Sequence, residues 1–147
     1  MKTGTKGIEL IKQFEGCSLK AYADPKTKAE PYTIGYGNTY YKDGSKIKLG
    51  DKITQQQAED LLLDLLPKYE AIVNKNVTID LTQNKFDSLV CFAWNCGKSE
   101  TLFKLVNTKA HDELKTWWVT HYINKGTPVE KGLTRRRTAE KDLYFSI

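Results

Sequence analysis

Residues 14–37 read FEGCSLKAYADPKTKAEPYTIGYG, and within this stretch the chain changes from helical to β-type patterning. Before it, apolar residues recur every three positions, which indicates the buried face of a helix that begins near Thr3 or Thr5. Gly16 is a natural stop for this helix, because glycine accepts the left-handed conformation that ends many helices. Glu15 is therefore expected in the last helical turn.

Short β-type segments and turn residues follow from Leu19 to Leu49. Residues 32–37 alternate between two kinds of side chain, and this period of two indicates a strand on which Thr33, Gly35 and Gly37 share a face. An Asp-Gly pair at 43–44 is a strong hairpin turn, expected to join segments on either side of it. The sequence predicts a small antiparallel sheet of about three strands.

The remainder of the chain has helical patterning. Thr54 begins one helix with a capping box, and Pro67 is expected to kink or split that helix. Thr82 caps a second helix, which Gly97 ends. Shorter helices are predicted over residues 101–106, 112–118 and 134–144.

The length of 147 residues suits one domain, 1–147, that buries a core without disulfides. A first helix plus β lobe of about residues 1–53, joined to a mainly helical lobe of about 54–147, gives an α+β architecture. The cleft that carries the active site is expected between these lobes.

The composition indicates which partners and which cellular location are compatible with the chain. The net charge of +5 favours anionic partners, among which are nucleic acid, acidic lipid and wall polymers. No apolar run approaches the ~18 residues of a membrane helix, and residues 1–9 lack the apolar stretch of a secretory signal. Cytoplasmic synthesis without stable membrane insertion is the expectation. The chain has three cysteines, Cys17, Cys91 and Cys96, which cannot all pair with one another. They are expected to be free thiols that are mostly buried.

Three polar residues in the opening stretch form a candidate catalytic group. Glycosidic hydrolysis normally needs one protonated carboxyl and one ionised carboxylate. The negative end of a helix dipole and an apolar neighbour disfavour the charged form of Glu15, which suits it to the acid role. Asp24 lies in a turn with more access to water and should stay ionised, and Thr33 can hold a water against it. On spacing alone, a surface glutamate and a turn-forming aspartate are the commoner explanation.

The runs Phe-Glu-Gly at 14–16, Leu-Lys-Ala-Tyr-Ala-Asp at 19–24 and Tyr-Thr-Ile-Gly-Tyr-Gly at 32–37 resemble the N-terminal signature of phage-type lysozymes, endolysins with a Glu–Asp–Thr triad. Further matches lie at residues 81–83, 86–90, 92–97, 132–133, 135–136 and 140.

The resemblance implies a lysozyme-like fold and a bacteriolytic glycoside hydrolase of the inverting kind. An enzyme of this kind hydrolyses the β-1,4 bond between N-acetylmuramic acid and N-acetylglucosamine in peptidoglycan. Cleavage of this bond lyses the host cell. By resemblance, Glu15 is the general acid, Asp24 orients or activates a water, and Thr33 assists. The segment Pro25–Pro31 is longer than is common in the family, and basic through Lys26 and Lys28, so it can either alter the grip on the substrate or shift Asp24 relative to Thr33.

Three further residues are candidates for contact with substrate. Gly35 leaves little side-chain bulk on its strand face, so a sugar ring can approach it, and Tyr32 precedes the same strand. Asn95 either caps a helix end or lines the cleft. Neither a cofactor nor a metal is expected, and the chain is expected to be a monomer that does not bind nucleic acid. It would be made in the host cytoplasm and reach the wall or periplasm once a holin has permeabilised the membrane.

The C-terminal charged and aromatic residues have mainly structural interpretations. Arg136 and Glu140 have the spacing of a helical ion pair, whereas Arg135 and Arg137 are expected to be solvated. Tryptophans in a helical bundle are more often part of the core than sugar-stacking platforms. This expectation applies to Trp117 and Trp118.

Four other activities remain open at this stage. A lytic transglycosylase would cleave the same bond without water. A zinc amidase would use His111 and His121 with Cys91 or Cys17, although surface histidines are the simpler interpretation. A Cys–His peptidase would use Cys17 or Cys91. The fourth alternative is a basic module that binds wall polymer or nucleic acid without catalysis.

Overall fold

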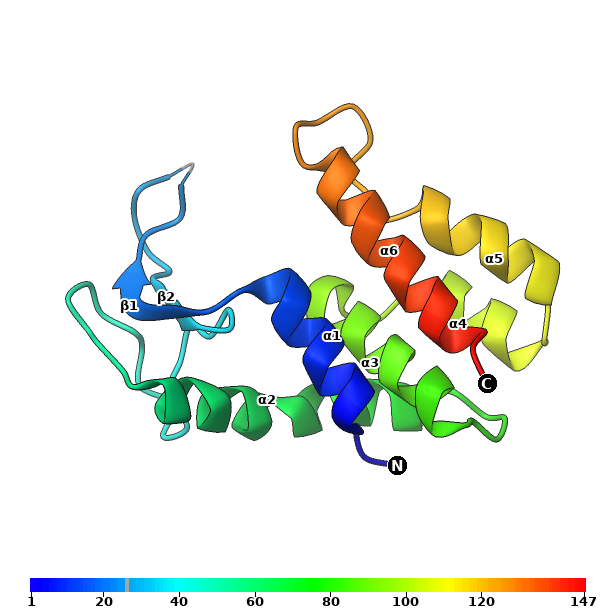
Figure 1. Cartoon of the computed structure of the whole chain (residues 1–147), viewed down its shortest axis with the longest axis horizontal. Coiled ribbons are helices and arrows are strands. Elements are labelled where there is room, and N and C mark those ends of the chain that lie inside the picture. The colour runs from blue at the N-terminus through cyan, green and yellow to red at the C-terminus, as the bar shows by residue number, and fades with distance from the viewer. Residues whose placement is uncertain (26) are drawn as a thin grey trace. The chain divides into compact units, whose positions relative to one another are not determined.

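The structure is a computed structural model that describes residues 1–25 and 27–147. Lys26, one of the two basic residues of the long loop, lies outside the described residues. The contacts of the chain divide into two compact units (Figure 1). Residues Lys12–Pro67 form the β unit, and Met1–Ile11 with Lys68–Ile147 form the helical unit. The described residues hold six helices and one two-stranded antiparallel sheet, so the predicted α+β class is confirmed.

The sheet of the β unit is smaller than the sequence predicted. Strand β1 (Ser18–Tyr22) pairs with β2 (Thr33–Gly35), with Ser18 opposite Gly35 and Tyr22 opposite Thr33. The prediction of a third strand is wrong for the described residues. The segments on either side of the Asp-Gly turn are joined by hydrogen bonds from the N–H of Tyr41 to the Ser45 carbonyl at 2.8 Å and from the N–H of Ile47 to the Thr39 carbonyl at 3.1 Å, and these make one isolated bridge between Tyr40 and Lys46 rather than a strand pair.

The alternation over residues 32–37 also ends early. The backbone turns after β2, where Gly35 and Gly37 have positive φ angles of 66° and 95°. Ile34 and Asn38 then face each other across this turn, each donating its N–H to the other's carbonyl at 2.9 Å. Thr33, Gly35 and Gly37 therefore do not share one extended face.

Apolar residues from the sheet, the hairpin and α2 form the core of the β unit. Ile34, Ile47 and Leu61 are buried at its centre. Helix α2 (Gln55–Asn76) begins at the predicted capping box, in which the N–H of Gln57 donates to the Thr54 hydroxyl at 3.1 Å. It continues through Pro67 without a break, so the expected split does not occur.

Four helices make up most of the helical unit: α3 (Gln83–Cys96), α4 (Glu100–Asn107), α5 (His111–Thr120) and α6 (Glu130–Tyr144). Both predicted ends of α3 are confirmed, since the Thr82 hydroxyl caps its first turn and Gly97, with a φ of 71°, ends it. Helix α3 packs against α6, α6 against α5, and α5 against α4 (Figure 1). The three C-terminal helices were predicted, although α6 begins earlier than expected.

The start of α1 (Thr5–Glu15) is bound to the middle of α3. The buried carboxylate of Asp87 accepts the N–H groups of Gly4 and Gly7 at 2.8 and 3.1 Å. A Cβ added at Gly7 would fall 2.7 Å from the Cβ of Asp87, so only glycine allows this approach. The carboxylate thus satisfies N–H groups that have no partner within the first turn of a helix.

Candidate functional site

Glu15 is the last residue of α1, as predicted, and Gly16 follows it with a φ of 65°. Its side chain is partly buried in the β unit. A Cβ added at Gly37 would lie 3.2 Å from Oε2 of Glu15, so the carboxylate sits against the turn that follows β2. The absent side chain at Gly37 leaves the space that the carboxylate occupies.

An ion-pair network holds the end of α1 that carries Glu15. Lys12, one turn earlier, forms an ion pair with Glu59 of α2 and lies over the Tyr36 ring at 5.8 Å from its centroid. The amide of Gln55 donates to the Tyr36 hydroxyl at 3.0 Å. The Lys12 ammonium lowers the pKa of Glu59, so the pair is ionised at neutral pH. Sequence reasoning missed this network, because its members are far apart in the chain.

Asp24 and Thr33 lie at the same end of the sheet. Thr33 faces Tyr22, the last residue of β1, and Asp24 follows two residues later. Both side chains are partly exposed. Asp24 opens the turn of the long loop, since its Oδ1 accepts the N–H of Thr27 at 3.4 Å and its carbonyl accepts that of Lys28 at 2.7 Å. Strand β1 therefore has Glu15 before its start and Asp24 after its end.

The two candidate substrate-binding residues of the β unit differ in their surroundings. Tyr32 lines a pocket of about 320 Å³. Gly35 is buried, and a side chain there would meet Asn38 Oδ1 at 3.4 Å and the Cα of Ala58 at 3.7 Å. The other residues around the pocket are Glu30, Pro31, Thr39, Tyr40, Lys46 and Ile47.

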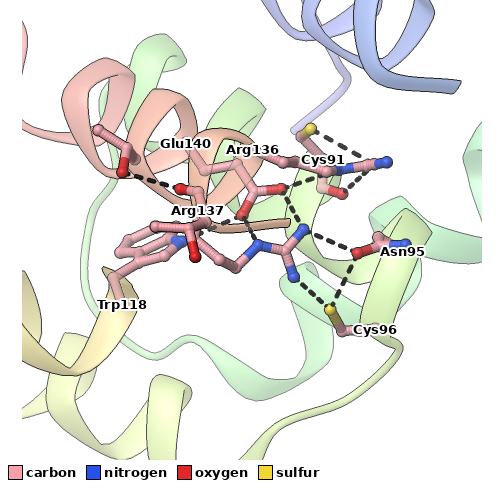
Figure 2. Close-up of polar contacts among 9 residues, drawn as sticks. Cys91, Asn95, Cys96, Trp118, Arg136, Arg137 and Glu140 are labelled. Atoms are coloured by element: carbon pink, nitrogen blue, oxygen red, sulfur yellow. Dashed lines mark hydrogen bonds and ion pairs between the residues drawn. The ribbon is translucent and has the colours of Figure 1, made fainter. Parts of the chain in front are cut away.

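Asn95, the third candidate, is exposed in the last turn of α3. Its Oδ1 accepts a hydrogen bond from Nη2 of Arg137 at 2.9 Å (Figure 2). The expectation that Arg137 is solvated is wrong, because its side chain is fully buried. It is buried since Glu140, on the same helix face, supplies a carboxylate that compensates its charge.

The predicted ion pair of Arg136 with Glu140 is confirmed, with Nε 3.3 Å from Oε2. Figure 2 shows both arginines converging on this carboxylate. Burial raises the pKa of Glu140, and the charges of Arg137 and Arg136 oppose that rise. Trp118 is fully buried, as expected for a core residue, and its Nε1 donates to Glu140 Oε1 at 3.2 Å. Trp117 is only partly buried.

The residues of the metal and thiol alternatives do not converge. His111 and His121 are exposed, and His121 stacks on Trp117 with ring centroids 4.9 Å apart. Within residues 1–25 and 27–147, no group of three or more His, Cys, Asp and Glu is arranged to hold a metal. All three cysteines are free, as predicted, but only Cys91 is fully buried, and Cys17 is exposed. Burial raises the pKa of Cys91 well above its ordinary value, which disfavours a nucleophilic thiolate there.

Comparisons with known proteins agree with this fold. The family model for phage lysozyme matches residues 12–140. The endolysin of Acyrthosiphon pisum secondary endosymbiont phage 1 is 36% identical, covering 99% of each chain. The endolysin of Bacillus phage PZA is 38% identical over 99% of this chain but only 56% of its own length. Among solved structures, an endolysin from Escherichia coli O157:H7 phage FAHEc1 superposes with a TM-score of 0.83 at 36% identity, covering 99% of this chain and 94% of that one.

These findings define a lysozyme-fold enzyme that cleaves peptidoglycan, as endolysins do. The chain belongs to the phage lysozyme family, which confirms the resemblance recognised in its sequence. In the part of the chain that the structure describes, no helix has the length and apolar character needed to cross a membrane.

Proposed function

We propose that this enzyme hydrolyses the β-1,4 bond between N-acetylmuramic acid and N-acetylglucosamine, with Glu15 as the general acid. The observation that carries the proposal is the position of Glu15 at the end of α1, with its carboxylate against Gly37. The Lys12–Glu59 ion pair ties this end of α1 to α2, which limits the movement of the helix end that carries Glu15. A fixed acid is what protonation of a leaving oxygen requires.

Asp24 and Thr33 supply the second half of the proposed reaction. The pairing of β1 with β2 brings the two residues to one end of the sheet, where both are accessible to water. Asp24 orients and activates a water through its carboxylate, and the Thr33 hydroxyl holds that water. Attack on the face opposite the leaving group inverts the anomeric configuration.

The substrate is a glycan strand, and two of its contacts are proposed here. The pocket beside Tyr32 has aromatic, hydroxyl and charged groups suited to an amino sugar. The exposed amide of Asn95 offers hydrogen bonding in the helical unit. Gly35 is buried against Asn38 and Ala58, so its proposed part in substrate binding is to keep the end of β2 free of side-chain bulk rather than to contact the sugar itself.

The deciding experiment compares Glu15→Gln with the parent on purified peptidoglycan and identifies the products by mass. The parent should release fragments with new reducing ends, even with a chelator present, and Glu15→Gln should release none. Glu9→Gln, an exposed position on the same helix, is the matched control and should stay active.

The other outcomes separate the alternatives. Anhydro-sugar ends would show a transglycosylase, and freed peptide termini or loss of activity with EDTA would show an amidase or peptidase. Binding without products, unchanged in Glu15→Gln, would show a non-catalytic module. Asp24→Asn should lower turnover strongly with little change in glycan affinity, because its role is in the water step. Equal turnover in Asp24→Asn and the parent would remove Asp24 from the mechanism.

We also propose that the enzyme is made in the host cytoplasm as a monomer and reaches the wall through a holin. The naming of its relatives as endolysins supports this biological role. Expression in a bacterial host should leave cells intact until a holin is co-expressed, and lysis should then follow. Lysis without a holin would refute this dependence.

A further inference from the structure

Arg137 is held in one orientation by groups on several sides. Its Nε lies 2.8 Å from Glu140 Oε1 as an ion pair, and its Nη2 donates to Glu140 Oε2 at 3.0 Å. The guanidinium carbon lies 4.9 Å from the centroid of the Phe92 ring, and Nη1 contacts the sulfur of Cys96 (Figure 2). A charge buried this completely persists only where such partners surround it.

The carboxylate that holds Arg137 is itself fixed. Glu140 is fully buried and accepts hydrogen bonds from Trp118 and from Nε of Arg136, at 3.2 and 3.3 Å. Arg136 is fixed in turn by the carbonyl of Cys91, 3.1 Å from its Nη2. The cluster spans α3, α5 and α6, so the direction of the Arg137 guanidinium is set by the packing of three helices.

One donor of this rigid cluster reaches an exposed side chain. Nη2 of Arg137 also donates to Asn95 Oδ1 at 2.9 Å, and Asn95 is exposed. A guanidinium has donors but no acceptor, so the amide atom that faces it must be the oxygen. This requirement settles which way the Asn95 amide is turned. Its NH2 group consequently points away from Arg137.

We propose that Arg137 is a positioning residue, which holds the Asn95 NH2 group ready to donate a hydrogen bond to an acetamido carbonyl of the glycan. The proposal rests on the proposed function for its substrate class. An exposed asparagine samples several rotamers, and fixing one before binding removes part of the entropy cost of association. Burying the charge of Arg137 costs free energy, and in this proposal the buried guanidinium has a role in binding because it orients Asn95 at the surface.

Asn95→Asp separates this role from a purely structural one. The aspartate keeps the acceptor for Arg137, so the melting temperature should not fall, but the donor is lost. The dissociation constant for purified glycan strands should rise about tenfold, the loss of roughly one good hydrogen bond. It is measured in a Glu15→Gln background at 0.3 M salt, where turnover is expected to be absent and the added charge is screened. In the otherwise unmutated enzyme, KM should rise by a similar factor and kcat should change little.

Arg137→Gln and the double variant test the coupling between the two residues. Arg137→Gln should weaken glycan binding by a similar factor, and adding Asn95→Asp to it should weaken binding no further. Asn124→Asp, exposed in the same unit, controls for charge and should leave affinity unchanged. Unchanged affinity in Asn95→Asp would overturn the proposal even where Arg137→Gln does not fold. Because affinity is read without turnover, failure here is distinct from failure of Glu15 as the acid.

Discussion

The carboxylate of Glu15 occupies the space beside Gly37 that a side chain at that position would need, with Oε2 3.2 Å from the site of a Cβ. Two properties of glycine are used at position 37. Its φ of 95° suits glycine, and its missing side chain admits the carboxylate. A side chain at position 37 would therefore require both a strained backbone and a shift of the Glu15 carboxylate by a few tenths of an ångström.

Gly37→Ala should lower turnover by about tenfold to a hundredfold, because the new methyl group displaces the proposed acid from its position. The variant should also lose about 1–2 kcal/mol of stability through backbone strain. Gly44→Ala is the matched control, since Gly44 has a φ of 88° and open space around its Cβ direction. It should lose comparable stability and keep its activity. Rates on purified peptidoglycan and chemical denaturation measure both, and equal activity of the two variants would contradict the prediction.

Lys12→Met should destabilise the protein by about 0.5–1 kcal/mol at neutral pH, because it removes the partner of Glu59. Lys12 lowers the pKa of Glu59 in the folded state. The stabilisation is therefore complete above the ordinary carboxyl pKa of about 4.3 and is lost as the pH falls through the lowered folded value. Urea denaturation of both proteins across the acid range should show their difference shrinking with decreasing pH.

The control for this ion pair is Lys98→Met. Lys98 lies 3.7 Å from Glu100, and both side chains are largely exposed. An exposed pair contributes little, so this variant should match the parent at every pH. A pH-independent loss in Lys12→Met would instead assign its effect to packing on Tyr36.

Glu140→Gln should destabilise the helical unit by about 3–5 kcal/mol, because it leaves two arginines buried without their anion. Asp142→Asn, which removes the exposed partner of Lys141, should change stability by less than about 1 kcal/mol. Thermal or chemical denaturation compares the two variants. A small loss in Glu140→Gln would mean that the neighbouring carbonyl and sulfur groups compensate the arginines without the carboxylate.

The three cysteines should differ in reactivity towards a thiol reagent such as DTNB. Cys17 is exposed and should react fast, whereas Cys91 is buried with a raised pKa and should react only on unfolding. Cys17→Ser should abolish the fast phase in the native protein and leave the count in denaturant lower by one. A fast phase that persists in this variant would place reactive thiol character at Cys96.

The sequence was sufficient for features that depend on neighbouring residues. The end of α1 at Glu15, the capping box at Thr54 and the limits of α3 at Thr82 and Gly97 follow from hydrogen bonds within a few positions, and all are present. The extent of the sheet was not predictable in this way. Whether the hairpin around residues 43–44 extends into strands depends on packing that local alternation does not report.

The same distinction between local and long-range contacts applies to the candidate site. Glu15, Asp24 and Thr33 were identifiable because helix end, turn and strand lie within one short stretch and resemble a known family. The Lys12–Glu59 pair and the burial of Arg137 depend on contacts between distant segments, so sequence gave no signal for the first and favoured the wrong interpretation for the second. Arg137 was expected to be solvated because the spacing assigned Glu140 to Arg136, and that both arginines share this one carboxylate is visible only in three dimensions.

The hydrogen bonds from Gly4 and Gly7 to Asp87 mean that the helical unit is discontinuous in sequence, whereas the β unit is one uninterrupted segment. A ribosome makes residues 12–67 before any of the residues that complete the helical unit. All contacts within the β unit, including those around Glu15, become available at that point of synthesis. Hydrogen bonds from the first seven residues reach residues 70–87, so these bonds cannot form until synthesis has passed the whole β unit.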